Sequence, residues 1–154
     1  MRAIARRWLN LHEEIQAHGQ ELERIVSEKA PSLMSSHGIS TMTAAEMLIL
    51  IGDNPERIKS EAALAKLCGV CPIPASSGKT IRMRLNRGGN RQANAALYRI
   101  AITRMRDHEA TKIYVIKRTA QGKSKREITR CLKRYIVPEF YRELCAPKHP
   151  RSAH

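Results

Sequence analysis

The sequence Asn90-Arg-Gln-Ala-Asn-Ala-Ala-Leu-Tyr-Arg-Ile-Ala-Ile-Thr-Arg-Met-Arg106 predicts a helix that packs one face into a protein core. That face is apolar at intervals of three and four residues, at Ala93, Leu97, Ile100, Ala101 and Met105. Neighbouring patterns predict further helices over residues 2–29, 61–67 and 110–120. We therefore expect a mainly α fold, with a short strand-and-loop segment around residues 70–88.

The stretch that leads into this helix, residues 72–94, is basic and rich in small residues. It contains two adjacent serines, three glycines and five Lys or Arg residues, with neither a carboxylate nor a histidine. From Ala62 to Arg106 the chain carries nine Lys or Arg residues and no Asp or Glu. Such a field predicts a binding site for a polyanion. The candidate nucleic-acid-binding side chains are Lys79, Arg82, Arg84, Arg87 and Arg91.

The composition of the whole chain indicates the kind of polyanion. The 154 residues suffice for one domain with a real core, and their net charge is +14 with a pI of 10.2. Residues 1–37 hold equal numbers of basic and acidic residues, so the net charge lies entirely in residues 38–154. This pattern favours a scaffold joined to a nucleic-acid-binding body. Aromatic residues make up only 4% of the chain, which argues against a surface built of base-stacking platforms.

The sequence shows no membrane or metal signal. Met1 leads into a charged amphipathic segment rather than a signal peptide, and no apolar run reaches the roughly 18 residues of a membrane-spanning helix. Cys68 and Cys71 have the spacing of zinc ligands, but no second pair completes such a site. We expect reduced core cysteines, no metal and no cofactor within this chain, no membrane partner, and a cytoplasmic, nucleoid-associated location.

Residues 2–29 carry a heptad pattern. Apolar residues fall alternately four and three apart, with His18 in one place of the series, at Ile4, Trp8, Leu11, Ile15, Leu22 and Ile25. Either the helix packs on its own domain, or it forms a coiled coil with a second copy or with another helix of the chain. The unbroken run of heptads favours the coiled coil. We therefore predict a homo-oligomer through residues 2–29 and a connector domain over residues 1–31.

Residues 33–51 predict a short helix, a turn at Gly38 and a second helix. Thr43 is the expected N-cap of the second helix, with Glu46 completing a capping box. The arrangement is that of a helix-hairpin-helix motif, in which hairpin amides and a helix N-terminus contact phosphates. Gly38 and Ser40 are therefore candidate nucleic-acid-binding residues, Ser40 standing where the motif usually has a second glycine. The alternative is a helical hairpin that only packs the domain.

The remaining boundaries follow from turn and capping residues. Residues 80–85 alternate between polar and apolar and predict a short strand. Ser124 and Glu127 form a capping box that opens a further helix, and Pro138 is expected to kink or end that helix. The compact domain is predicted to span residues 32–145, followed by a disordered tail over residues 146–154.

Ser76 and Ser77 stand before Gly78, where the chain can turn sharply and expose a hydroxyl. A serine becomes a nucleophile only with help from a base, a metal or a favourable potential. The surrounding cations could hold a phosphate and stabilise a phosphoryl transition state, but residues 62–106 contain no proton acceptor. From the residues alone, a simple hydroxyl-containing turn is the favoured interpretation. Gly78-Lys-Thr80 lacks the first glycine of a Walker motif, which argues against a nucleotide triphosphatase.

Four ordered motifs give the chain a resemblance to a known family. They are Gly38-Ile-Ser-Thr-Met-Thr-Ala-Ala, Gly52-Asp, Leu67-Cys-Gly-Val-Cys-Pro-x-Pro-x-Ser-Ser-Gly-Lys and Leu85-Asn-Arg-Gly-Gly-Asn-Arg-x-x-Asn-x-Ala-Leu-Tyr98. Together they resemble the C-terminal domain of the bacterial transposases of insertion sequences 110, 116 and 902, a DEDD-type family guided by a bridge RNA. Residues 1–30 are similar to the coiled-coil connector that precedes this domain, and Lys123-Ser-Lys-Arg-Glu-Ile matches its later helix.

The resemblance implies a divided active site. In this family an N-terminal RNase-H-like domain binds divalent metal through four acidic residues, and the C-terminal domain supplies a serine that attacks DNA. Ser77 holds the position of that serine, with Ser76 as the alternative. The chain begins at the connector, so we expect Mg²⁺ and the RNase-H-like domain to lie outside it, and the chain to be inactive without them. The implied partners are DNA and, as a second candidate, a guide RNA.

Two principal functions remain open at this point. The first is the C-terminal part of an insertion-sequence transposase, which supplies a serine nucleophile for DNA transposition or recombination. The second is a non-catalytic DNA- or RNA-binding module that multimerises through residues 2–29. A structural basic protein of the ribosome-associated kind is a third interpretation of the same charge.

Overall fold

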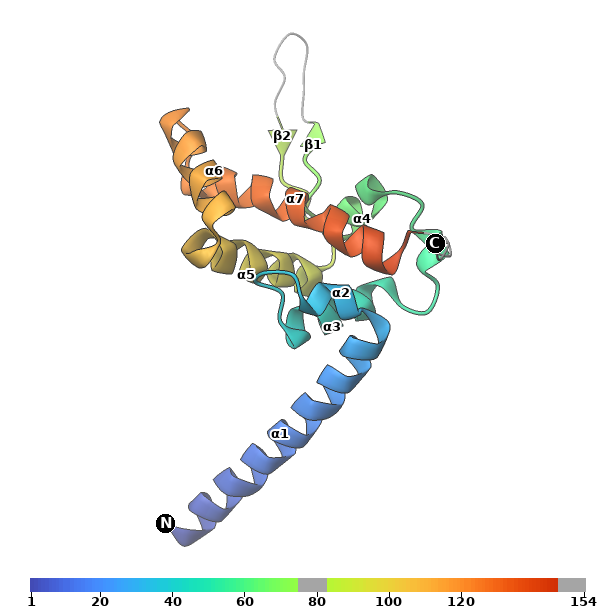
Figure 1. Ribbon diagram of the computed structural model, residues 1–154, viewed down its shortest axis with the longest axis vertical. Coiled ribbons are helices and arrows are strands. Elements are labelled where there is room, and N and C mark those ends of the chain that lie inside the picture. The colour runs from blue at the N-terminus through green and yellow to red at the C-terminus, as the bar shows by residue number, and fades with distance from the viewer. Residues whose placement is uncertain (75–82, 147–154) are drawn as a thin grey trace, which may run out of the picture.

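The computed structural model describes residues 1–74 and 83–146 and is mainly helical, as predicted. Figure 1 shows a long helix leading away from a compact body of shorter helices, and two short strands on the opposite side of that body. In chain order the elements are α1 (Arg2–Lys29), α2 (Pro31–Met34), α3 (Thr41–Ile51), the 3₁₀ helix η1 (Pro55–Arg57), α4 (Glu61–Leu67), β1 (Ile73–Pro74), β2 (Met83–Arg84), α5 (Arg91–Asp107), α6 (Glu109–Ala120) and α7 (Lys125–Leu144). No helix in the described part of the chain is both long enough and apolar enough to cross a membrane.

Helix α5 lies at the centre of the body, in contact with α3, α6 and α7. Its buried face consists of Ala93, Ala96, Leu97, Ile100 and Ala101, which confirms the predicted inner face except at the half-buried Met105. The small residues on that face allow the neighbouring helices to approach closely. The Asn90 side chain accepts a hydrogen bond from the Ala93 amide at 2.9 Å, so the predicted start of this helix is correct.

The start of α3 corrects the prediction of its N-cap. The cap is Ser40 rather than Thr43: the Thr43 amide donates to Ser40 Oγ at 3.4 Å, and the Ser40 amide donates to Thr43 Oγ1 at 2.9 Å. Thr43 therefore occupies the third helical position of the capping box. The earlier start buries Ile39 in the core, which explains why this cap is chosen over the other hydroxyl. Glu46 takes no part in this cap and forms an ion pair with Arg99 of α5 instead.

Arg104 of α5 connects three parts of the body. Its two terminal nitrogens donate to the two carboxylate oxygens of Glu139 on α7 at 2.6 and 2.7 Å. Its Nε donates to the His37 carbonyl oxygen at 2.8 Å, in the turn between α2 and α3. A fork-to-fork pair of this kind fixes geometry as well as charge, and here the Arg104 side chain is only 12% exposed. The Gly38 turn is thereby held against α5.

Helix α7 passes through Pro138 and ends only at Leu144, so of the two predicted outcomes, a kink or an end, the end is wrong. Proline at this place removes one backbone hydrogen bond, a local cost. The residues around it, Ile136, Val137 and Phe140, are nearly or fully buried in the core. Burial of these large side chains on both sides of Pro138 offsets the lost hydrogen bond and keeps the helix continuous.

Helix α1 has the predicted bounds but packs on the body only at its C-terminal end. Val26 is buried and Leu22 half-buried, whereas Ile4, Trp8 and Ile15 are 72%, 62% and 69% exposed. The interpretation in which the whole heptad face packs on its own domain is therefore wrong for residues 2–21, since Figure 1 shows that part of α1 clear of the body. Helix α1 contacts α2 and α3, but every residue from 2 to 21 is exposed, so the apolar face of that part stays open to solvent.

The short strands β1 and β2 pair antiparallel, with Ile73 opposite Arg84 and Pro74 opposite Met83. The predicted strand over residues 80–85 is observed at Met83–Arg84, and residues 80–82 lie outside the described part. After β2, three hydrogen bonds tie the chain to the C-terminal end of α4: Asn86 Nδ2 to the Lys66 carbonyl (3.1 Å), the Asn90 amide to the Leu67 carbonyl (2.7 Å), and Asn94 Nδ2 to the Cys68 carbonyl (2.8 Å).

Two glycines make this attachment possible. A Cβ built on Gly89 would lie 2.2 Å from both the amide nitrogen and the Cα of Gly69, and 2.9 Å from the Cys68 carbonyl carbon. Gly69 has φ of +67° and ends α4 with a left-handed residue. The backbones therefore touch at Gly69 and Gly89, where no side chain fits.

We predict that Gly89→Ala destabilises the protein by about 1–3 kcal/mol, because backbone atoms must move to admit the new methyl group. The measurement is the free energy of unfolding in urea, followed by circular dichroism. Gly88→Ala is the matched control, since its Cβ would meet nothing closer than Asn86 Oδ1 at 3.5 Å. The control should stay within about 0.5 kcal/mol of wild type. Equal unfolding midpoints for the two variants would contradict the contact described here.

Candidate nucleic-acid interface

A groove of about 1020 Å³ lies where the base of the β1–β2 pair, the start of α5 and the N-terminal half of α7 come together. These elements lie side by side in the upper part of Figure 1. Among the residues that the structure describes, one carboxylate, Glu127, lines the groove together with seven basic side chains: Arg84, Arg87, Arg91, Lys123, Arg130, Lys133 and Arg134. Two stretches of the sequence, residues 84–91 and 123–134, thus build one basic surface.

The structure brings together three of the predicted binding residues, Arg84, Arg87 and Arg91. Arg84 lies on β2, Arg87 in the following turn, and Arg91 in the first turn of α5. All three are exposed, so their guanidinium groups are accessible to a ligand. A guanidinium group can hold a phosphate through two hydrogen bonds, and three of them along one wall fit a phosphate chain.

The four cations contributed by α7 and its preceding turn were not predicted. Their signal is present in the sequence: Lys123, Glu127, Arg130 and Arg134 recur four and three residues apart, which places them on one helix face. That face could have been identified as basic. Nothing in the local sequence, however, indicates that it lies opposite Arg84 and Arg91.

Lys133 is held in place by Asn94 of α5. Its Nζ donates to Asn94 Oδ1 at 2.8 Å, while Asn94 Nδ2 donates to the Cys68 carbonyl. The lysine is half-buried, and burial, followed by the nearby charge of Arg130, lowers its pKa. An anion in the groove would counter the charge of Arg130 and favour the protonated lysine. Lys133 is thus a positioned charge rather than a freely moving one.

The groove cations are not neutralised within the protein. Over residues 1–74 and 83–146, none of the seven forms an ion pair with a carboxylate, whereas Arg24, Arg99 and Arg104 elsewhere all do. The one carboxylate of the groove, Glu127, is committed to capping α7, since it accepts bonds from the Ser124 hydroxyl (2.7 Å) and amide (2.9 Å). The hydroxyl bond and the amide bond both lower the pKa of Glu127. With seven described cations against one carboxylate, the groove presents an excess of positive charge, as an anion-binding surface does.

Cys68 of the core and Cys131 of the groove lie in different environments. Cys68 is fully buried, and burial, with a smaller effect from Cys145, raises the pKa of its thiol to about 12. Arg134 Nη2 lies 3.4 Å from the Cys131 sulfur. Burial acts to raise the pKa of Cys131, but hydrogen bonds and charge from Arg134, Arg118 and Tyr114 outweigh it and lower this pKa. Cys68 is a core residue, and Cys131 adds a polarised sulfur to the groove.

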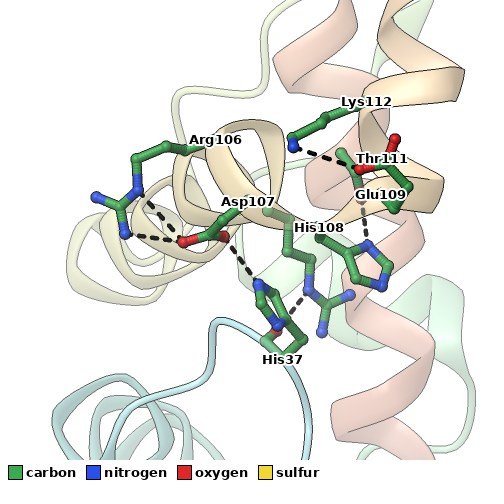
Figure 2. Close-up of polar contacts among 8 residues, drawn as sticks. His37, Arg106, Asp107, His108, Glu109, Thr111 and Lys112 are labelled. Carbon is green, nitrogen blue, oxygen red and sulfur yellow. Dashed lines mark hydrogen bonds and ion pairs between the residues drawn. The ribbon is translucent and has the colours of Figure 1, made fainter.

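A second polar cluster lies at the junction of α5 and α6, as Figure 2 shows. His37 Nε2 contacts Asp107 Oδ1 at 2.8 Å, and the His37 and His108 rings stack with 5.0 Å between their centroids. Hydrogen bonds from His37 and then Arg106 lower the pKa of Asp107. Glu109 pairs with Lys112 at 3.3 Å. These contacts fasten the α2–α3 turn to the α5–α6 junction.

The carboxylates of this cluster do not fit a divalent metal ion. Asp107 is already paired with a histidine and an arginine, and Glu109 with a lysine. Across the described residues, no group of three or more His, Cys, Asp or Glu side chains could hold a metal. These side chains therefore do not provide a site for a divalent metal ion.

The structure does not place the other predicted site residues in the lining of the groove. Ser76, Ser77, Lys79 and Arg82 lie outside the described residues, in the segment that links β1 to β2. Gly38 and Ser40 lie in the α2–α3 turn, next to the second half of α5, and do not line the groove. The hydroxyl and the amide of Ser40 are both engaged in the cap of α3.

Comparison with known proteins gives two matches. A family model described as "Transposase IS116/IS110/IS902 family" matches residues 30–115, from the start of α2 into α6. The chain is also similar to the "Insertion element IS110 uncharacterized 43.6 kDa protein" of Streptomyces coelicolor, with 31% identity over 117 residues. That alignment covers 74% of this chain and 29% of the relative, so the chain spans less than a third of the relative's length.

Proposed function

The chain belongs to the IS116/IS110/IS902 family of transposases, and from that premise we propose that it holds nucleic acid for DNA transposition and supplies a serine nucleophile. One observation carries the proposal. Seven cations free of carboxylate partners in the described chain converge on a groove at the base of the β1–β2 pair, and the segment that links these two strands contains Ser76 and Ser77. A phosphate chain bound along the groove would lie beside the two ends of that segment.

The proposed chemistry is attack of the Ser77 Oγ on a phosphodiester phosphorus. A bond forms between Oγ and phosphorus, the bond from phosphorus to a sugar oxygen breaks, that oxygen takes up a proton as it leaves as a hydroxyl, and the DNA strand stays attached as a phosphoserine. Arg84, Arg87 and Arg91 are suited to stabilise the charge that develops on the phosphoryl oxygens. The serine proton must pass to a group outside residues 62–106, which contain no carboxylate and no histidine. We propose that a separate RNase-H-like domain supplies that acceptor and the Mg²⁺ ions.

A non-catalytic role is the second candidate, and the exposed apolar face of α1 favours it. A coiled coil of two α1 helices would bring two grooves into one particle without any chemistry. Binding through several grooves raises the overall affinity for a long polyanion such as DNA or a guide RNA. The two candidates share the groove and differ only in whether Ser77 forms a covalent bond.

The first test of the proposed function concerns the three arginines of the groove. Arg84→Gln, Arg87→Gln and Arg91→Gln combined should weaken binding of duplex DNA and reduce its salt dependence, because each lost phosphate contact lowers the slope of log K against log salt by about 0.9. Fluorescence anisotropy over a range of NaCl concentrations measures both quantities. Arg2→Gln, Arg6→Gln and Arg7→Gln combined remove the same charge from the exposed start of α1. An equal loss in the two triple variants would show that net charge, not the groove, binds DNA.

The second prediction concerns the serine. With the family's RNase-H-like domain added as a separate protein, wild type should form a covalent adduct with DNA that survives denaturing electrophoresis. Ser77→Ala should abolish the adduct, and Ser76→Ala should retain it. Adduct formation by Ser77→Ala at the wild-type level would exclude Ser77 as the nucleophile. If none of the three proteins forms an adduct while DNA binding persists, the non-catalytic role is supported.

The third prediction concerns α1. Ile15→Lys should shift the protein from dimer to monomer in sedimentation velocity, because it places a charge in the apolar heptad face. Gln20→Lys adds the same side chain on the opposite face and should leave the dimer intact. Identical sedimentation of wild type and Ile15→Lys would contradict oligomerisation through this face.

A further inference from the structure

We infer that the groove takes an unpaired nucleotide, with the ring of Tyr98 as the surface on which the base stacks. This inference rests on the proposed function, because it names the part of the nucleic acid that the groove recognises. Tyr98 lines the groove and is 51% exposed, although the adjacent Leu97 is fully buried. Its hydroxyl forms no hydrogen bond within the described part of the chain.

The position of Tyr98 along α5 places the ring between cations. Arg91, Asn94 and Tyr98 are three and four residues apart, so they follow one face of the helix from its first turn onward. Asn94 holds Lys133 at 2.8 Å, and α7 also contributes Arg130 and Arg134 to the same groove. A base on Tyr98 would thus have cations on both sides for the phosphates before and after it.

The rest of the lining is apolar as well as basic. Val70, Pro72, Leu85 and Ala95 line the groove together with Tyr98, and Leu85 is itself 51% exposed. A site for phosphate alone would need charge and hydrogen-bond donors but no apolar wall. A nucleotide has an aromatic base with apolar faces joined to a charged phosphate, and it matches both parts of this lining.

The ring selects an unpaired base rather than a duplex. In a duplex the base faces are covered by their neighbours, and a protein reaches only base edges and the backbone. An aromatic side chain in a bounded groove can stack on a base only after that base has left the helical stack. The chain has too few aromatic residues for a row of base-stacking side chains, but a single stacking residue is compatible with its composition.

The experiment compares the full-length wild type with three variants for binding to labelled oligonucleotides of about 20 nucleotides, as single-stranded DNA, single-stranded RNA and duplex DNA. Tyr98→Ala should weaken single-strand binding about tenfold and change duplex binding by less than about twofold, because base stacking on one aromatic ring has this magnitude. Tyr98→Phe keeps the ring and should bind as wild type does. The DNA and RNA arms show which strand the groove prefers.

Tyr135→Ala is the matched control. Tyr135 is 62% exposed on α7 but does not line the groove, and its ring packs edge-on against Tyr114 at 5.7 Å. The control should leave all three affinities unchanged. A second measurement needs no variant: single strands carrying 5-bromouracil should crosslink to Tyr98 on irradiation, with the modified peptide identified by mass spectrometry.

The outcomes separate this inference from the proposed function. Equal losses for single strand and duplex in Tyr98→Ala, or a Tyr98→Phe variant as weak as Tyr98→Ala, would overturn the stacking role. So would crosslinks that map away from the groove. In those cases the dependence of binding on Arg84, Arg87 and Arg91 would still support the basic groove. If wild type bound none of the three nucleic acids with salt-dependent affinity, the proposed function itself would fail.

Discussion

The contact between the backbones of Gly69 and Gly89 is the constraint on which the functional surface depends. It brings the chain that follows β2 directly against the end of α4, at a distance that no Cβ permits. Asn90 then begins α5 one residue later, and Asn94 reaches both the Cys68 carbonyl and the Lys133 ammonium. The contact between the two glycines thus helps to fix the position of Lys133, the groove cation that Asn94 holds.

The protein distributes its charges in two ways. In the helical body, Arg104 donates hydrogen bonds to Glu139 and to the His37 carbonyl, and Arg99 pairs with Glu46. These charged side chains therefore hold neighbouring elements together. In the groove, the described structure leaves the cations without carboxylate partners. Like charges held close together repel one another, and only an anion from outside relieves that repulsion. The contrast between paired and unpaired arginines is therefore informative about function, whereas the net charge of +14 by itself is not specific.

Helix α1 and the groove both expose large apolar or aromatic side chains. The heptad face of α1 leaves large apolar side chains such as Trp8 in contact with water, and the groove leaves Tyr98 and Leu85 half exposed. A second chain would cover the first surface and a nucleic acid the second. Helix α1 carries the first surface, and α5 and α7 carry part of the second, so these helical parts keep their shape before a partner arrives and lose little conformational freedom on binding.

The sequence by itself determined the helices. The caps at Asn90 and Ser124, the left-handed glycines and the apolar periodicities are local, and the observed bounds follow them closely. Local reasoning failed at two places that are packed into the core. Thr43 is the predicted cap of α3, whereas the observed cap is Ser40, directly after the buried Ile39; α7 continues through Pro138, with Phe140 buried beyond it.

Only the tertiary structure decided which cations meet. Arg84, Arg87 and Arg91 could be identified from one basic stretch of sequence, but Lys133 and Arg134 join them across more than 40 residues of chain. Periodicity assigns a residue to a face of its own helix and carries no information about what that face lies opposite. That arrangement is set by the packing of α5 against α7 and by the glycine contact that fixes where α5 begins.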